Sequence, residues 1–510
     1  MAINFDLSPE QAGLQKAARS FADDRLSLVE GVISPLPTPE ARFAAIKPFY
    51  QDMVDAGFMK ALVPVEYGGT AMPSLDFALA AEELTRVDIN VPTALLGTGL
   101  GLQPIIHFGT AEQKAQFLPS FAGSEPLLAA WAFTETSGGA NFDSSDPSTG
   151  VQTFARLDGD EWVINGDKHF TTNGCGFDGN GAALISVLCR TDLNLPPRES
   201  LAVIVVPGDT PGIKVESYID TMGHRATISP RITFTDVRVP AGNLIGAPGD
   251  GIEISRKTFN WTSSLIGAAC VGRMRAAFDY AFEFAKTDKR SGPVPIIDYQ
   301  NVGYMLVDIK TRIEAARYFT WKACDLYDKT NGADEELGHM VKVFASELSV
   351  QVVYDTMRVV GVNSYGDQTP IAAIMEDVLC FPVYDGGNMG VRAASCTRCS
   401  RARTTTRWSP QQASQLSEPT RPRSGEFPGT GWACTRDDAG MCGSDGSCRK
   451  IPSGWRSHST SPNPVPPRGR SSRLGAARLG HTPRMWCRPP ETTGAGFAPR
   501  SRPPVRLPQH

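Results

Sequence analysis

The stretch FPVYDGGNMGVR, residues 381–392, closes the patterned part of this 510-residue chain and holds its best candidate for chemistry. Asp385 lies there between aromatic and aliphatic neighbours on one side and two glycines on the other. Burial in apolar surroundings raises the pKa of a carboxyl group, which makes it a useful base near neutral pH. The glycines let the backbone approach a flat ligand closely. On local pattern alone, Asp-Gly-Gly-Asn is more typical of a plain turn.

The residues before this stretch predict a bundle of long helices. Apolar residues recur at helical spacing over 252–286, 296–328 and 335–360, and a shorter helical pattern over 374–380 leads into Phe381. Helices of this length are typical of bundles. We therefore expect a C-terminal helical domain, a four-helix bundle, over residues 246–392.

Residues 127–245 carry a different pattern. About six short apolar runs are separated there by turns rich in proline, glycine and asparagine, which is typical of strands. Between two of these runs, Asp158-Gly159-Asp160 predicts a hairpin. This region is expected to be a compact β-domain.

The first 126 residues predict helices only. Ser8, Pro9 and Gln11 form a strong helix start, with an N-cap serine, proline at the first position and glutamine at the third. Gly97–Gly101 resembles half of a dinucleotide-binding motif, but no strand precedes it, so close helix packing is the favoured interpretation. The expected fold class is α+β, with an N-terminal α-helical domain, a middle β-domain and a C-terminal bundle.

Charge and composition divide the chain after residue 392. Residues 1–392 hold 31 Lys and Arg against 48 Asp and Glu, a net charge of −17, whereas residues 393–510 hold 19 against 6, a net charge of +13. The second segment has 16 prolines but only nine Ile, Leu, Val and Phe, too few for a core. We expect a disordered basic tail over 393–510, and its abrupt change of composition suggests a shifted reading frame or a mis-joined exon.

Several classes of protein are excluded by composition. No apolar run approaches the roughly 18 residues of a membrane span. The N-terminus has neither the basic nor the apolar part of a secretory signal, and the C-terminal LPQH is not a peroxisomal address. The widely spaced cysteines of the body indicate core thiols, and those of the tail do not form a convincing zinc set. We expect a soluble intracellular protein without metal, membrane or nucleic-acid partner, its compartment (cytoplasmic, peroxisomal or mitochondrial) left open.

Over residues 5–392 the chain resembles the acyl-CoA dehydrogenase superfamily of flavoenzymes. The resemblance is carried by WAFTETSGGAN from residue 131, DGDEWVINGDKHFTTN at 158–173, VGVNSYG at 360–366, VYDGGN at 383–388, and the pair Arg290 and Gln300. Within the superfamily, RFAAIKPFY at 42–50, PVEYGGT at 64–70 and CFPVYDGGNMGVR at 380–392 are most similar to the nitroalkane oxidase-like branch.

This resemblance implies an FAD site between the β-domain and the bundle. The residues matching cofactor contacts are Trp131, Thr134, Phe170, Thr172, Arg290, Gln300, Gly361, Gly366, Gly387 and Asn388. Aromatic rings can cover a flat ring system, hydroxyls can bond its polar edge, and arginine suits a phosphate. Asp385 matches the catalytic base, Arg392 an arginine that supports it, and Thr262 a hydroxyl residue near that carboxylate.

The implied reaction removes a proton next to an activating carbonyl or nitro group while electrons pass to the flavin. Dehydrogenation of an acyl-CoA thioester is expected first, because such members are more numerous. The alternative is a nitroalkane oxidase that releases nitrite and hydrogen peroxide, and a further alternative is an inactive member whose basic tail binds a partner. Asn260 and Ser263 replace the Asp and Arg that bind CoA in relatives, which weakens the thioester interpretation.

The resemblance also implies partners. A small-molecule substrate would be accompanied by an electron-transfer protein or oxygen as the electron acceptor. A homotetramer or homodimer is expected. Fatty acid metabolism and secondary metabolism both remain open.

Overall fold

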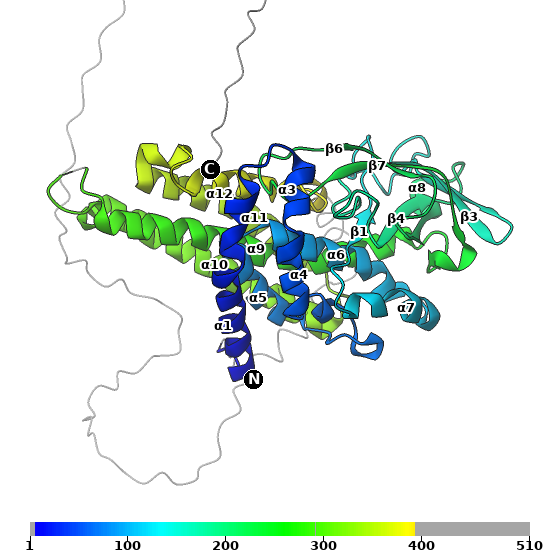
Figure 1. Ribbon diagram of the computed structural model, residues 1–510, viewed down its shortest axis with the longest axis horizontal. Helices are drawn as coiled ribbons and strands as arrows, with labels where there is room; N and C mark the ends of the chain where they lie inside the picture. The colour runs from blue at the N-terminus through cyan, green and yellow to red at the C-terminus, as the bar shows by residue number, and fades with distance from the viewer. Residues whose placement is uncertain (1–5, 291, 393–510) are drawn as a thin grey trace, which may run out of the picture. The chain divides into compact units, whose positions relative to one another are not determined.

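The computed structural model describes residues 6–290 and 292–392, and its elements follow the expected order of helices, strands and helices (Figure 1). In Figure 1 the colour runs from the blue N-terminal helices through cyan and green strands to the green and yellow C-terminal helices. The predictions made for residues 393–510, a disordered basic tail with a binding role, lie outside the described residues.

The N-terminal part is helical, as predicted. Its helices are α1 (Pro9–Asp24), α2 (Val29–Ile33), α3 (Pro39–Ala45), α4 (Lys47–Asp55), α5 (Ser74–Val87), α6 (Asn90–Phe108) and α7 (Ala111–Phe117). The predicted start of α1 is confirmed, because the Ser8 hydroxyl accepts from the Gln11 amide at 3.2 Å and the Gln11 side chain accepts from the Ser8 amide at 3.1 Å. This reciprocal pair satisfies two otherwise unpaired donors of the first turn.

The glycines of residues 97–101 serve close packing inside α6, not nucleotide binding. A Cβ at Gly99 would lie 2.4 Å from the Trp261 ring, and one at Gly101 would lie 2.6 Å from the Ala130 amide nitrogen. Neither distance is compatible with a side chain, so glycine allows α6 to pack directly on its neighbours.

The middle region forms one sheet of eight strands. The strands are β1 (Ala129–Ala132), β2 (Phe154–Asp158), β3 (Glu161–Lys168), β4 (Leu184–Arg190), β5 (Leu201–Val206), β6 (Ile213–Tyr218), β7 (Pro230–Pro240) and β8 (Leu244–Ile245), with the short helix α8 (Pro197–Ser200) between β4 and β5. Their order is β6-β7-β3-β2-β4-β5-β8, and β1 pairs in parallel with β4. The predicted hairpin is confirmed, because Asp158 pairs with Glu161 across the β2–β3 turn.

The C-terminal helices pack around α9. They are α9 (Gly251–Thr287), α10 (Gln300–Thr330), α11 (Glu336–Val360) and α12 (Ile371–Cys380), with the short 3₁₀ helix η7 (Gly361–Tyr365) after α11. Helix α9 contacts α5, α6, α10, α11 and α12. Every residue from 260 to 274 is buried, so polar side chains on this stretch need partners inside the protein. No helix of the described ranges is long and apolar enough to cross a membrane.

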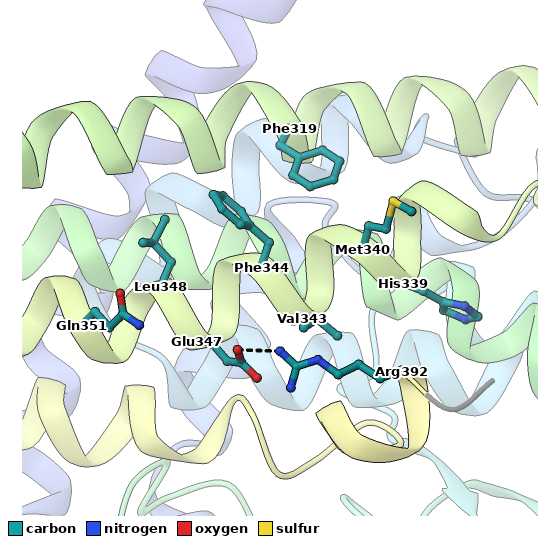
Figure 2. A pocket seen from close by; sticks show the side chains of 9 residues that line it. All are labelled: Phe319, His339, Met340, Val343, Phe344, Glu347, Leu348, Gln351 and Arg392. Carbon is teal, nitrogen blue, oxygen red and sulfur yellow. Dashed lines mark hydrogen bonds and ion pairs between the residues drawn. The ribbon is translucent and has the colours of Figure 1, made fainter. Parts of the chain in front are cut away.

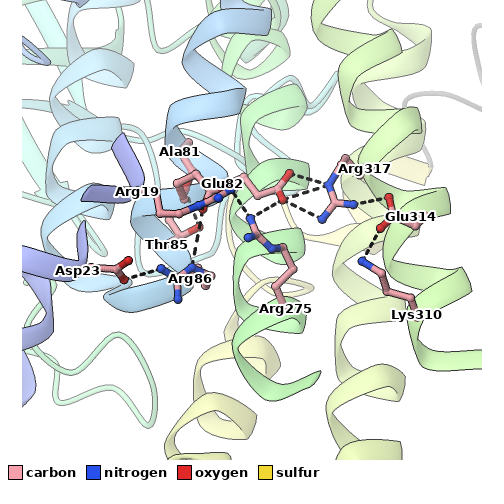
Figure 3. Close-up of polar contacts among 11 residues, drawn as sticks. Arg19, Asp23, Ala81, Glu82, Thr85, Arg86, Arg275, Lys310, Glu314 and Arg317 are labelled. Atoms are coloured by element: carbon pink, nitrogen blue, oxygen red, sulfur yellow. Dashed lines mark hydrogen bonds and ion pairs between the residues drawn. The ribbon is translucent and has the colours of Figure 1, made fainter. Parts of the chain in front are cut away.

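A buried ion network joins the N-terminal helices to the bundle (Figure 3). Glu82 and Glu83 of α5 are buried. Arg275 of α9 contacts Glu82 at 2.7 Å and Glu83 at 2.9 Å, Arg317 of α10 contacts Glu82 at 2.9 Å, and Arg19 of α1 contacts Glu83 at 2.8 Å. Four helices are thereby held in register by charges that would be costly to leave unpaired.

Candidate active site

Asp385 lies in a turn that follows α12, where the backbone takes the left-handed conformation three times in succession. The φ angles are 51° at Asp385, 82° at Gly386 and 61° at Gly387. Glycine adopts this conformation without steric cost, so Gly386 and Gly387 do not strain the turn. Asp385 has a side chain, so its left-handed conformation is unfavourable. The residue keeps some accessible surface while its carboxylate is densely surrounded. The turn thus holds one enclosed carboxylate in a segment that is itself partly exposed.

Two hydroxyls of α9 hold this carboxylate. Thr262 Oγ1 donates to Asp385 Oδ1 at 2.9 Å, and Ser263 Oγ donates to Oδ2 at a longer 3.4 Å. Desolvation raises the pKa of Asp385 to about 6, and Lys342, Thr262 and Ser263 oppose that rise only in part. The result is a carboxyl group that is ionised at neutral pH and is still more basic than an ordinary aspartate.

The structure brings Thr262 and Asp385 together, as the resemblance implied, and adds Ser263, which sequence reasoning considered only as a replaced CoA contact. The sequence contained a signal that Ser263 has an internal partner. It follows Thr262 on a stretch of α9 that is buried on all sides, where a hydroxyl requires an internal partner.

Arg392 does not support Asp385 in the described residues, contrary to expectation. Its Nη2 pairs with Glu347 Oε2 of α11 at 2.7 Å, and both side chains are substantially exposed. The physical reason is the backbone conformation after Gly387. A helical turn begins at Asn388, and it directs Arg392 toward α11 instead of back toward residue 385.

A buried lysine takes the place near the carboxylate that was expected for Arg392. Lys342 Nζ of α11 donates to the Tyr384 carbonyl at 2.9 Å and to Asn388 Oδ1 at 2.8 Å. Burial lowers the pKa of Lys342, and the charge of Asp385 opposes that change. Sequence reasoning missed Lys342, although a single lysine among the apolar and small residues of its helix was a usable signal.

Asn388, expected as a cofactor contact, is bonded within the protein. Its Nδ2 donates to Ser346 Oγ at 3.0 Å and to Glu347 Oε1 at 3.1 Å, while its Oδ1 accepts from Lys342. The side chain is therefore committed to α11. Gly387 belongs to the left-handed turn and contributes only backbone.

The residues expected to contact the flavin ring gather at the ends of β1 and β3. Trp131 is in β1 and Thr134 follows that strand, while Phe170 and Thr172 follow β3. Phe259 of α9 connects this group to the carboxylate: its ring centroid lies 6.5 Å from that of Trp131, and its carbonyl oxygen lies 3.1 Å from Thr262 Oγ1. Helix α9 therefore contacts the aromatic group through Phe259 and the carboxylate through Thr262.

These residues fit a planar cofactor with a polar edge. Trp131 Nε1 and Thr171 Oγ1 are buried and have no hydrogen-bond partner in the part of the chain that the structure describes. A buried unpaired donor is costly unless a ligand satisfies it. Phe170 is 55% exposed with a left-handed φ of 52°, so an aromatic face is held outward at the same place. Thr171 was not predicted, because the family resemblance matched its neighbour Thr172 instead.

The residues expected at the cofactor phosphates are brought together only in part. Arg290 Nη2 donates to the Val360 carbonyl, immediately before Gly361, whose φ is 75°. Arg290 also pairs with Asp288 at 2.7 Å. Gln300 begins α10, is exposed and bonds the Tyr304 hydroxyl. Gly366 ends η7 in extended conformation.

A cavity of about 550 Å³ lies between α10 and α11 (Figure 2). It is lined by Phe319, His339, Met340, Val343, Phe344, Glu347, Leu348, Gln351 and Arg392. Figure 2 shows the Glu347–Arg392 pair at one side of it. Asp385, Thr262 and Ser263 do not line it, so this cavity is distinct from the carboxylate site. The described residues also hold no group of His, Cys, Asp and Glu side chains suited to a metal ion.

Comparison with protein families matches three successive parts of the chain. Residues 8–125 match the model described as acyl-CoA dehydrogenase, N-terminal domain, residues 130–237 match the middle domain, and residues 249–393 match the C-terminal domain. Together these matches span nearly all of the described residues.

Individual relatives point to two chemistries. Nitroalkane oxidase of Podospora anserina is 36% identical over 410 residues, covering 77% of this chain and 94% of that protein. Its solved structure superimposes with a TM-score of 0.74 at 35% identity, covering 78% of this chain and 96% of the other. Cyclohex-1-ene-1-carbonyl-CoA dehydrogenase of Geobacter metallireducens is 33% identical over 338 residues, covering 66% of this chain and 85% of that protein.

Proposed function

This chain belongs to the acyl-CoA dehydrogenase family of FAD-dependent oxidoreductases, and from that premise we propose that it oxidises small nitroalkanes, with Asp385 as the catalytic base. The observation that carries the proposal is the Asp385 carboxylate, held by Thr262 and Ser263 and given a pKa of about 6. A base of that strength suits removal of a weakly acidic proton from carbon at neutral pH.

In the proposed step, Asp385 takes a proton from the carbon that bears the nitro group. The C–H bond breaks, the proton moves to a carboxylate oxygen, and the electron pair is delocalised into the nitro group. The hydroxyls of Thr262 and Ser263 favour the ionised carboxylate before the step and fix its direction. FAD, when bound, supplies the two-electron acceptor, which oxygen later regenerates. Overall, a nitroalkane, oxygen and water give an aldehyde, nitrous acid and hydrogen peroxide.

The residues that would hold the cofactor are those whose polar groups or aromatic faces are free for it. Trp131 and Thr171 offer buried donors without partners among the described residues, and Phe170 offers an exposed ring. Arg290, beside Gly361, bonds Asp288 and the Val360 carbonyl, and its guanidinium has further N–H groups suited to the phosphates. Thr134 and Thr172 are partly accessible near the same strand ends and complete the proposed set.

The bundle offers little to a CoA thioester at the positions that relatives use. The Asn260 side chain donates to the carbonyls of Gly332 at 3.1 Å and Asp334 at 3.0 Å, so its amide hydrogens are occupied by the α10–α11 connection. Ser263 is directed at Asp385. Neither position supplies a charge. These contacts favour a small substrate over a nucleotide thioester, which reverses the order expected from the sequence.

Acyl-CoA dehydrogenation is the second candidate. It is favoured by the similarity to a protein named cyclohex-1-ene-1-carbonyl-CoA dehydrogenase, at 33% identity over 85% of that protein. The same base would take a proton next to the thioester carbonyl, and an electron-transfer protein would replace oxygen as acceptor. A homotetramer or homodimer is compatible with either reaction.

Anaerobic titration of the full-length, FAD-loaded protein separates the two candidates. Nitroethane and 1-nitrohexane are expected to bleach the flavin, and admission of air is expected to release nitrite in proportion. Butyryl-CoA and octanoyl-CoA serve as the alternative substrates. Bleaching by an acyl-CoA alone, with an enoyl product, would contradict the proposal. Asp385→Asn with bound flavin is the control for non-enzymatic reduction.

A further inference from the structure

Lys342 is a charged side chain that is wholly buried in α11. Its exposed fraction is 0%, and within residues 6–290 and 292–392 its ammonium donates to two acceptors, the Tyr384 carbonyl and Asn388 Oδ1. Burying an ammonium is costly unless its hydrogen bonds and a neighbouring negative charge offset the loss of water. Packing alone does not explain why a lysine is buried at this position.

The two acceptors lie on either side of the Asp385 turn. Tyr384 precedes Asp385, and Asn388 follows the two left-handed glycines. The Tyr384 carbonyl also accepts from the Gly387 amide at 3.1 Å, so the lysine bonds the same oxygen that closes the turn. Asn388 is in turn fixed to α11 through Ser346 at 3.0 Å. Lys342 therefore spans a strained segment that holds the carboxylate.

We propose that Lys342 is a positioning residue for proton abstraction: its ammonium bridges both sides of the turn at residues 384–388 and thereby holds the Asp385 carboxylate against Thr262 and Ser263. This inference rests on the proposed role of Asp385 as the base. Without the ammonium, the turn loses two charge-assisted hydrogen bonds, and the carboxylate loses its fixed direction.

The ammonium also acts on Asp385 through its charge. Its charge opposes the rise in the pKa of Asp385, whereas Arg392 pairs with Glu347. The titratable and polar groups that act on this pair are Thr262, Ser263 and Cys270 of α9, Glu347 of α11, and Tyr384 beside Asp385. Loss of the ammonium would raise the pKa of Asp385 further.

The test compares Lys342→Met with Lys342→Arg in the full-length, FAD-loaded protein. The protonated carboxyl of Asp385 is followed by infrared titration and identified as the band that Asp385→Asn removes. In Lys342→Met we expect its midpoint to rise by about one pH unit, and flavin reduction by nitroethane at neutral pH to slow about tenfold with little change in KM. In Lys342→Arg, the midpoint of the Asp385 titration should lie close to the wild-type value. A flavin-bound Lys342→Met protein with the wild-type midpoint and rate would overturn the proposal.

Two further variants complete the test. Lys286→Met, at an exposed lysine paired with Glu283, should change neither readout. If Lys342→Met does not fold, Asn388→Ala removes one acceptor and keeps the charge. It should slow reduction at an unchanged midpoint, and an unchanged rate would overturn the positioning role. The infrared titration needs no substrate, so a shifted midpoint in a protein that does not oxidise nitroalkanes would contradict the proposed function alone.

Discussion

Helix α9 contributes to two buried acidic sites that differ in chemistry. At one, Arg275 of α9 pairs with Glu82 and Glu83 in the network of Figure 3. At the other, Thr262 and Ser263 of the same helix hold Asp385. The first site has a guanidinium on each carboxylate, whereas the second has hydroxyls and a lysine that bonds the turn instead of the carboxylate.

The pKa shifts follow from that difference. Burial by itself would raise the pKa of Glu83, but hydrogen bonds from Arg19 and Arg275 bring it below the ordinary value. Burial also raises the pKa of Asp385, and its weaker partners leave it at about 6. A directly paired carboxylate is a structural anion, and a carboxylate held by hydroxyls can exchange a proton near neutral pH. We therefore expect substitutions at the first site to change stability, and substitutions at the second site to change the reaction rate and its pH dependence.

The largest expected effect is on the rate of Asp385→Asn. The amide cannot accept the substrate proton, so flavin reduction by nitroethane should fall by about 10²–10⁴-fold. Stopped-flow absorbance under anaerobic conditions measures the rate, and the flavin spectrum shows whether the cofactor stays bound. Normal turnover by this variant would remove Asp385 from the role of base.

Glu82→Gln should act on stability instead. It leaves the half-buried Arg275 and Arg317 with a weaker acceptor, which should lower the free energy of unfolding by about 3 kcal/mol, the lower end expected for breaking a buried pair. Urea unfolding at neutral pH measures this change, with the exposed Glu283→Gln as control. The rate per bound flavin should not change. A stable Glu82→Gln protein with slow flavin reduction would show that the two sites are not separate.

Thr262→Val should shift the pH dependence. The rate of flavin reduction by wild-type protein should rise with pH through about 6 as Asp385 loses its proton. Because the Thr262 hydroxyl favours the ionised form, its removal should move this midpoint upward by roughly half a unit to one unit. Ser255→Ala is the control on the same helix, since the Ser255 hydroxyl donates to the Gly251 carbonyl of that helix at 2.6 Å. A downward shift in Thr262→Val would contradict the account.

Arg392→Ala should have the smallest effect. Its ion pair with Glu347 is largely exposed, and such pairs contribute about 1 kcal/mol or less. We expect less than a twofold change in the rate of flavin reduction and no shift of its pH midpoint. A tenfold loss would instead assign Arg392 the supporting role that the sequence first predicted.

Much of the fold could be predicted from the sequence because its signals are local. The Ser8–Gln11 cap, the hairpin at Gly159 and the long helical periods depend on residues within one element. Asp385 could also be found, because the family resemblance is carried in part by the contiguous stretch VYDGGN, although Asp-Gly-Gly-Asn alone is typical of a plain turn. These features need no knowledge of distant contacts.

The partners of the carboxylate could not be predicted in the same way. Lys342 reaches the turn from 42 residues earlier in the chain, and Arg317 reaches Glu82 across 235 residues. Which cation meets which carboxylate depends on the rotation of α10 and α11 and on three successive left-handed φ angles. Arg392 was assigned to Asp385 through the family resemblance, and the turn between them directs it toward Glu347 instead.

The central claim is that Asp385 removes the proton from the carbon beside the nitro group. The most direct measurement compares neutral nitroethane with its preformed anion, which has already lost that proton, as substrates of Asp385→Asn. We expect oxidation of the neutral form to fall by about 10²–10⁴-fold, while oxidation of the anion stays close to the wild-type rate. An equal loss with both forms would contradict the claim, because the defect would then lie outside proton abstraction.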